Sequence, residues 1–161
     1  MLTPLSYYVE VPPGRIYLCF TREYGIYRLF LPGSKPALGE LPEPGELSWP
    51  ELEDDLKKYF GGTSVEFRYP LDLSGWSTFA RKVMGEVLRI SHGSTRSYGE
   101  VASRAGVPGG ARAVGRVMAG NPVPLLIPCH RVIRSDGSPG GFTSGASWKE
   151  YLLNLEKTGR L

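Results

Sequence analysis

The sequence predicts an α+β fold: a small N-terminal α/β domain with an antiparallel sheet, followed by a mostly helical C-terminal domain with a helix-turn-helix. Two observations predict this fold. Segments rich in aromatic and β-branched residues fill the first thirty positions, and helical periodicity dominates after residue 76. Turn-type residues occupy 70–75 between them, so we place the domains at 1–72 and 73–161.

Three strands are predicted at the N-terminus, over residues 6–11, 14–20 and 25–31. Their aromatic and β-branched residues are typical of a pleated, partly buried surface. The breaks at Pro12-Pro13-Gly14 and around Gly25 are typical of turns. Together these segments predict a small antiparallel meander.

A loop and one helix complete the N-terminal domain. Residues 32–50 contain five prolines and three glycines, which predicts a loop. Residues 50–60 begin with proline and acidic residues and end with lysines before two glycines, which predicts a helix. The alternation in residues 65–69 predicts one more strand.

Four helices are predicted in the C-terminal domain, over residues 77–90, 98–105, 110–119 and 147–156. The second and third are joined by the turn 106–109, which is the helix-turn-helix pattern. The exposed side of helix 110–119 is Ala, Gly and Arg, and such a surface lets a helix approach DNA closely while its arginines contact phosphates or bases. Two helices that merely pack in a small α domain are the alternative.

Charge is distributed unevenly along the chain. Residues 1–72 carry seven Lys/Arg and eleven Asp/Glu, a balance of −4, whereas residues 73–161 carry twelve and five, a balance of +7. A basic C-terminal half indicates contact with a polyanion, although solvated surface charge is the alternative. The sequence contains no membrane-length apolar run and no signal-peptide pattern. Its two cysteines make no disulfide framework and one is a candidate nucleophile, so we expect a reducing, cytoplasmic or nuclear, setting. The absence of glutamine and the many loop prolines suggest a thermophile.

The segment 121–132, Asn-Pro-Val-Pro-Leu-Leu-Ile-Pro-Cys-His-Arg-Val, places Cys129 directly before His130 in a proline-rich loop that we expect to follow a short apolar strand. A neighbouring base or cation shifts a thiol toward the nucleophilic thiolate. The alternative is a cysteine that acts as a small buried hydrophobe. We interpret Cys19, within a predicted strand, in that second way.

Other residues could complete a site around Cys129. His130 could be a general base, a thiolate partner or a structural donor, and Glu156 on the last helix could orient its imidazole or be a solvated acid. The flexible segment 137–145 could close over a flat ligand, with Phe142 stacking and Thr143 making polar contacts, or be a linker. His92 is expected to be an exposed loop residue.

Together these residues resemble the O6-alkylguanine-DNA alkyltransferases. Residues 127–132, Ile-Pro-Cys-His-Arg-Val, match the active-site signature of that family, and residues 120–124 lead into it as they do there. Residues 111–115 look like its recognition helix, 97–102 like the preceding helix and 148–156 like its closing helix. The resemblance covers residues 76–156, and the N-terminal part carries no motif.

The resemblance implies a DNA repair protein that flips O6-alkylguanine out of duplex DNA and transfers the alkyl group irreversibly to its own cysteine. The implied catalytic residues are Cys129 as acceptor, His130 and Glu156 as proton relay, and Asn121 as the residue that holds the turn. The implied substrate-binding residues are Tyr98, Val132, Phe142 and Thr143. The implied DNA-binding residues are Arg112, which wedges into the base stack, with Ala113, Gly115 and Arg116. We expect a monomer that needs no cofactor and no membrane.

This sequence departs from the family at three points. Phe142 and Thr143 replace a common tyrosine and serine, so one hydroxyl contact is lost. No histidine precedes residue 92, so the zinc site of some relatives is not available here. Two other classes stay open: a non-enzymatic lesion sensor, against which Cys129 argues, and a cysteine hydrolase, which leaves the basic half unexplained.

Overall fold

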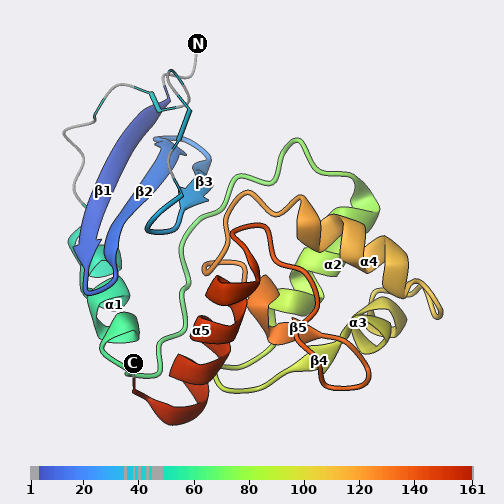
Figure 1. The fold of residues 1–161 in the computed structure, drawn as a ribbon. Helices are drawn as coiled ribbons and strands as arrows, with labels where there is room; N and C mark the ends of the chain where they lie inside the picture. The colour runs from blue at the N-terminus through green and yellow to red at the C-terminus, as the bar shows by residue number, and fades with distance from the viewer. Residues whose placement is uncertain are drawn as a thin grey trace.

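The computed structural model describes residues 4–34, 36–37, 39, 41–42, 44 and 49–160. Figure 1 shows a sheet and a helix beside a mostly helical part, with an extended segment running between them. The strands are β1 (Leu5–Val11), β2 (Gly14–Thr21) and β3 (Gly25–Phe30), which pair in the order β1-β2-β3. Both pairings are antiparallel, so the predicted meander is confirmed. Much of the loop predicted at 32–50 lies outside the described residues.

Helix α1 (Pro50–Phe60) forms where the sequence predicts it. Proline occupies its first turn with two acidic residues, and two lysines occupy its last turn, which complements the helix dipole. One face, formed by Leu52, Leu56, Tyr59 and Phe60, is fully buried. This face fixes α1 against the sheet, where the Tyr7 hydroxyl also donates to Glu53.

The strand predicted over residues 65–69 is wrong. Burial alternates along this segment as expected, but its residues form no ladder. The alternation has another cause: Phe67 packs on the ring of Tyr59 and Tyr69 packs on Trp49. Sheet pairing follows only at Leu71, which forms an isolated parallel bridge with Ile26. The segment therefore joins the two parts of the chain as a packed, extended connection.

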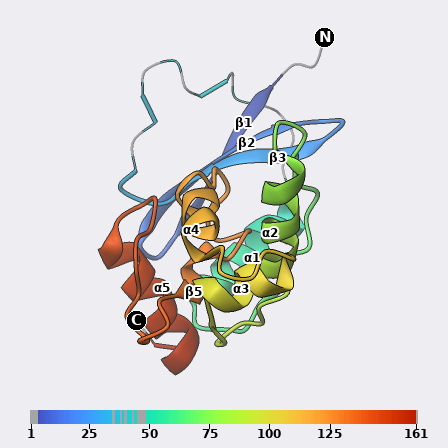
Figure 2. The ribbon, with the colours of Figure 1, turned by 90° about the vertical axis from the view of Figure 1, so that its right-hand side faces the viewer.

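The C-terminal part contains α2 (Thr78–Leu88), α3 (Tyr98–Arg104), α4 (Ala111–Ala119) and α5 (Ala146–Thr158), as the periodicity predicts. The Ser77 hydroxyl caps α2, and Ser97 with Glu100 forms a capping box at α3. Helices α3 and α4 pack together and α2 contacts both, as Figure 2 shows. The predicted helix-turn-helix pair is therefore present.

The short apolar strand expected before Cys129 does not form. Residues 123–128 make a tight turn, with one bridge between Pro124 and Ile127 and with Leu125 at a positive φ of 75°. Prolines lack the N–H that a ladder needs, so this segment cannot form a paired strand. Instead, the 3-10 helix η1 (Cys129–Arg131) and the strand β5 (Val132–Ile133) follow, and β5 pairs with β4 (Arg96–Ser97).

The two parts of the chain share one apolar core. A single buried cluster extends from the sheet through α1 to α2, α3 and α5. Hydrogen bonds cross between the parts from Leu29 to the Pro122 carbonyl and from Trp148 to the Pro32 carbonyl. Among the described helices, none is both long and apolar enough to cross a membrane.

Gly25 permits the close approach of β3 and the connecting segment. Its φ is +99°, and an added Cβ would lie 2.2 Å from the Pro70 carbonyl oxygen. We expect Gly25→Ala to lower the free energy of unfolding by about 2–5 kcal/mol, measured by urea denaturation. The matched control is Gly85→Ala in α2, where the added Cβ meets nothing within 4 Å. This control should stabilise by up to about 1 kcal/mol, and equal effects of both substitutions would contradict the proposed close approach.

Candidate active site

Cys129 opens the 3-10 helix η1 and is almost completely buried, with 2% of its surface exposed. Its sulfur accepts a hydrogen bond from Asn121 Nδ2 at 3.1 Å. The same amide nitrogen donates to the Ile127 carbonyl, and Asn121 Oδ1 accepts from the Val123 N–H. Asn121 therefore closes the proline-rich turn and contacts the sulfur that the turn presents.

Glu156 reaches His130, which sequence alone leaves open. His130 Nε2 lies 2.7 Å from Glu156 Oε1, and both side chains are buried. A carboxylate accepts only, so this contact places the imidazole proton on Nε2 and leaves a lone pair on Nδ1. His130 Nδ1 is buried and has no hydrogen-bond partner among the described residues. It is the nitrogen left to receive a proton.

Three further groups hold the same carboxylate, and sequence analysis assigned them no role. Arg131 forms a bidentate pair with Glu156, from Nε to Oε2 at 2.9 Å and from Nη2 to Oε1 at 2.8 Å. The Tyr59 hydroxyl donates to Oε1 at 2.7 Å, and the Gly93 N–H donates to Oε2 at 3.0 Å. Arg131 lies within the signature, but helical periodicity marks Tyr59 only as a core residue.

The pKa values of the site follow from its burial. Burial raises the pKa of the Cys129 thiol to about 11, against the opposing effects of Asn121, Lys149 and nearby backbone N–H groups. The thiol is therefore protonated at neutral pH, contrary to the expectation that its neighbours favour thiolate. Burial also lowers the pKa of His130, despite its hydrogen bond to Glu156. A protonated thiol beside a neutral imidazole is an arrangement suited to general-base catalysis.

Glu156 stays ionised in this setting. Burial opposes its ionisation, but hydrogen bonds from His130 and Arg131 outweigh burial and hold the pKa of the carboxyl well below its usual range. The Arg131 guanidinium is anchored at its other end, because Nη1 donates to the Ile90 carbonyl at 2.6 Å. The ion pair is therefore buried and fully hydrogen-bonded.

Lys149 is a buried lysine that sequence analysis missed. Its Nζ donates to the Val132 carbonyl at 2.5 Å, to the Tyr98 hydroxyl at 3.2 Å and to the Gly141 carbonyl at 3.2 Å. Burial lowers the pKa of Lys149 to about 8, and its charge acts on Cys129. The spacing of Lys149 with the buried residues Leu152 and Glu156 is a helical stripe that could have revealed it.

A pocket of about 490 Å³ lies between α4 and the segment after residue 137. Its walls include Tyr98, Arg112, Gly115, Phe142 and Thr143, so five of the predicted binding residues meet here. A volume of this size suits a small flat ligand. The pocket approaches the surroundings of Cys129 through Tyr98, which is hydrogen-bonded to Lys149.

Other predicted residues lie outside this pocket. Ala113 and Arg116 are on α4 but do not line it, and Val132 and Cys129 are buried and do not line it either. The Thr143 hydroxyl donates to the Ala119 carbonyl at 3.1 Å, which ties the segment after residue 137 to the end of α4. The predicted residues therefore lie in one region of the structure, but they do not all line the same pocket.

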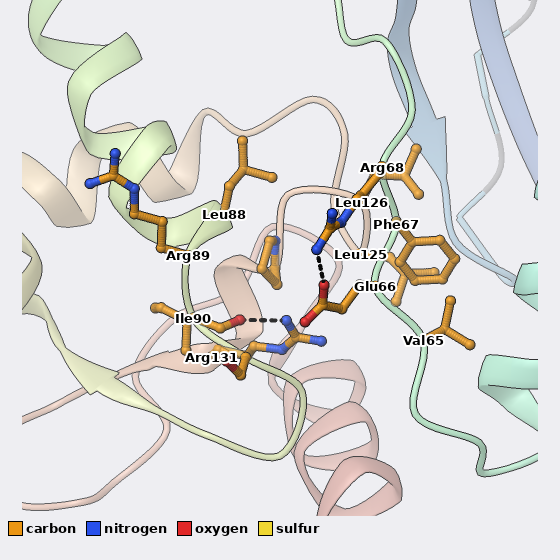
Figure 3. Close-up of a pocket in the computed structure, with 12 residues that line it drawn as sticks. Val65, Glu66, Phe67, Arg68, Leu88, Arg89, Ile90, Leu125, Leu126 and Arg131 are labelled. Atoms are coloured by element: carbon orange, nitrogen blue, oxygen red, sulfur yellow. Dashed lines mark hydrogen bonds and ion pairs between the residues drawn. The ribbon is translucent and has the colours of Figure 1, made fainter.

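Figure 3 looks into a second cavity, of about 320 Å³, which borders the turn that precedes Cys129. It is surrounded by residues 65–68 of the connecting segment, by the end of α2 and by the proline-containing turn at 125–128. Arg131 lines this cavity while its Nη1 is bonded to the Ile90 carbonyl. The cavity therefore borders the ion pair rather than the thiol.

The comparisons with known proteins agree with this geometry. A family model described as 6-O-methylguanine DNA methyltransferase, DNA binding domain, matches residues 78–158. This chain belongs to the 6-O-methylguanine DNA methyltransferase family. The match includes Cys129, His130 and Glu156, and it leaves out Tyr59 on α1.

Relatives within the methyltransferase family extend the similarity to the N-terminal part. A methylated-DNA--protein-cysteine methyltransferase from Mycobacterium tuberculosis is 44% identical over 117 residues, which are 73% of this chain and 69% of that protein. One from Methanosarcina acetivorans is 37% identical over 154 residues, 91% of this chain and 94% of that protein. The crystal structure of Mycobacterium tuberculosis OGT in complex with DNA matches with a TM-score of 0.82 at 35% identity, covering 96% of this chain and 94% of that one.

Because the Glu156–Arg131 ion pair is buried, we expect a single substitution in it to lower the stability of this methyltransferase-family protein strongly. Glu156→Gln leaves the Arg131 charge, itself only 6% exposed, without a counter-ion. We expect a loss of about 3–5 kcal/mol in the free energy of unfolding at neutral pH, measured by urea denaturation. Because the folded-state pKa of Glu156 is lowered, its contribution is present above its unfolded pKa of about 4.3 and declines as pH falls below it.

The control for that experiment is Glu66→Gln. Glu66 pairs with Arg68 at 2.7 Å, but both side chains are mostly exposed. This substitution should change stability by less than about 1 kcal/mol. Similar losses for both variants would show that the Glu156 pair is not a buried, desolvated pair in solution.

Proposed function

We propose that this protein repairs DNA by flipping O6-alkylguanine out of the duplex and transferring the alkyl group irreversibly to Cys129. The observation that carries this proposal is the buried Cys129 thiol beside the neutral His130 imidazole, which the ionised Glu156 orients. Relatives named methylated-DNA--protein-cysteine methyltransferases support it. The protein would act as a stoichiometric enzyme, one molecule for each lesion.

The chemical step follows from the protonation states. His130 Nδ1 takes the thiol proton through a bridging water, and the sulfur attacks the alkyl carbon. The sulfur–carbon bond forms as the carbon–O6 bond breaks, and the electron pair of that bond stays on guanine O6. Hydrogen bonds from Tyr98 or Thr143 would stabilise the departing base. The thioether is stable, and no group of the described site offers a route back to the thiol.

The helix pair and its charge supply DNA binding in this proposal. Extruding a nucleotide costs a few kcal/mol, less at a damaged pair. Arg112, exposed on α4 at the wall of the pocket, would fill the space that the base leaves. Ala113 and Gly115 would let the helix approach the minor groove, and Arg116 would contact phosphate. Phe142 would stack on the extruded guanine, and backbone around Val132 would contact its amino edge.

The roles of the two parts of the chain belong to the same proposal. Residues 73–161 would form the DNA-binding and alkyl-acceptor domain, with residues 1–72 as an N-terminal α/β domain that packs against it. A cytoplasmic location, or a nuclear one in a eukaryote, fits a free reactive thiol, because such compartments keep cysteines reduced. The thiol of Cys129 forms no disulfide in the structure.

Intact-protein mass spectrometry tests the proposed reaction. After incubation with a duplex that carries one O6-methylguanine, the protein should gain one methyl group, located on Cys129 by peptide mapping. A Cys129→Ser variant is the control and should gain none. Binding to the duplex with no change in mass would instead support the lesion sensor, and neither binding nor transfer would favour the hydrolase.

The wedge role of Arg112 predicts a substrate-dependent loss. We expect Arg112→Ala to slow repair of duplex DNA by about ten- to a hundredfold, while reaction with the free O6-alkylguanine base is unchanged. The measurement is the rate at which the protein gains the alkyl group, from duplex DNA and from the free base. Arg22→Ala, which removes the same charge from an exposed turn, is the control and should leave both rates unchanged. Equal losses on both substrates would count against the wedge.

A further inference from the structure

Tyr59 is a residue of the N-terminal part that enters the candidate active site. It lies in the last turn of α1, is fully buried, and its hydroxyl donates to Glu156 Oε1 at 2.7 Å. Figure 1 shows the end of α1 beside the end of α5, and close contact between Gly62 and Gly159 places these ends together. The hydrogen bond therefore spans the two parts of the chain.

The Tyr59 hydroxyl binds the same oxygen of Glu156 that contacts His130. Oε1 of Glu156 also accepts from His130 Nε2 at 2.7 Å, so Tyr59 and His130 share one acceptor. The other donors to this carboxylate, Arg131 and Gly93, come from the C-terminal part. Among the described residues, Tyr59 is the one donor that the N-terminal part contributes.

The surroundings of Tyr59 hold its hydroxyl in place. Its ring packs edge-on against Phe60 at 5.3 Å and against His92 at 5.6 Å, and it also contacts Phe67. His92, expected to be exposed, is instead partly buried against this ring. The packing of the ring on these sides directs the hydroxyl toward Glu156.

We propose that Tyr59 is a positioning residue for alkyl transfer, whose hydroxyl orients Glu156 and limits how strongly that carboxylate draws the His130 proton. This inference rests on the function proposed above. It gives the N-terminal part a role in the reaction: without the hydroxyl, the relay lacks one of the donors that set its geometry and charge.

The expected effect has a definite sign. Removing the hydroxyl leaves more of the negative charge of Oε1 for His130, which raises the pKa of the imidazole. Imidazolium cannot accept the thiol proton, so the rate of alkyl transfer falls as His130 becomes protonated at low pH. Raising the pKa of His130 moves this fall, the acid limb of the pH–rate profile, to higher pH. Other titratable or charged groups also face this cluster from the elements packed around it. They are Arg131 and Cys129 on η1, His92 in the turn after α2, and Lys149 and Tyr151 on α5.

The test compares Tyr59→Phe with Tyr69→Phe. Tyr69 also belongs to the N-terminal part, and its hydroxyl also donates to a carboxylate, Asp55, at 2.7 Å, away from the relay. The second-order rate of alkyl gain from free O6-benzylguanine is measured by mass spectrometry between about pH 5 and pH 9. The free base removes DNA binding from the measurement.

We expect Tyr59→Phe to slow transfer about tenfold at neutral pH, a part of what a general base contributes, and to shift the acid limb upward by about one pH unit. Tyr69→Phe should behave as the wild type does. A profile for Tyr59→Phe that superimposes on the wild-type profile, or one lowered equally at every pH, would overturn the proposal. The second result would assign Tyr59 a structural role only.

A second variant keeps the proposal testable if Tyr59→Phe does not fold. 3-Fluorotyrosine at position 59 preserves the ring and makes the hydroxyl a stronger donor. It should draw charge from Oε1, lower the pKa of His130 and shift the acid limb to lower pH, opposite to phenylalanine. An unshifted profile would overturn the proposal. Absence of alkyl gain by the wild type would overturn the proposed function and this inference with it, whereas normal transfer with unshifted profiles overturns the inference alone.

Discussion

The buried carboxylate of Glu156 is the constraint on which the rest of the structure depends. A charge inside a protein is tolerated only when it is paired and hydrogen-bonded. Glu156 meets this demand with donors from the end of α1, from the turn after α2 and from η1. These segments are far apart in the sequence, so their hydrogen bonds to one carboxylate fix their positions relative to one another. The turn at residues 121–128, which leads into η1 and Cys129, is held at the same place.

The same burial determines how the thiol reacts. A thiol whose pKa burial raises to about 11 is a weak nucleophile until a base removes its proton. This protects a residue that can be used only once, since oxidants and stray alkylating agents act on accessible thiolates. In the proposed reaction, the reactivity of the thiol depends on His130, which burial keeps neutral, and on a substrate bound in the pocket that Tyr98 lines.

Local patterns in the sequence predicted the local structure well. Helices such as 50–60 and 110–119 followed from periodicity and end signals, because these act within a few turns. The two wrong strands, 65–69 and the one before Cys129, arose where alternation or apolarity reflected packing without a ladder partner. Within the site, Glu156 was a candidate from its place on the last predicted helix, and the resemblance implied its role. Lys149 was missed although its helical spacing marks it as facing the core, and Tyr59 was missed because its contact with Glu156 joins segments far apart in the sequence.

The shared core makes the division of the chain near residue 72 a change in architecture rather than a break in packing. Helix α1 is anchored to the sheet through its apolar face, and its last turn carries the hydroxyl that Glu156 accepts. Strand β3 likewise donates from Leu29 to Pro122, directly beside Asn121. Any rotation of the N-terminal part would therefore act on the site at two places, at Asn121 in the turn before Cys129 and at Glu156 on α5. The attachment of the N-terminal part at these two places therefore helps to fix the buried Glu156 carboxylate and the buried Cys129 thiol relative to each other.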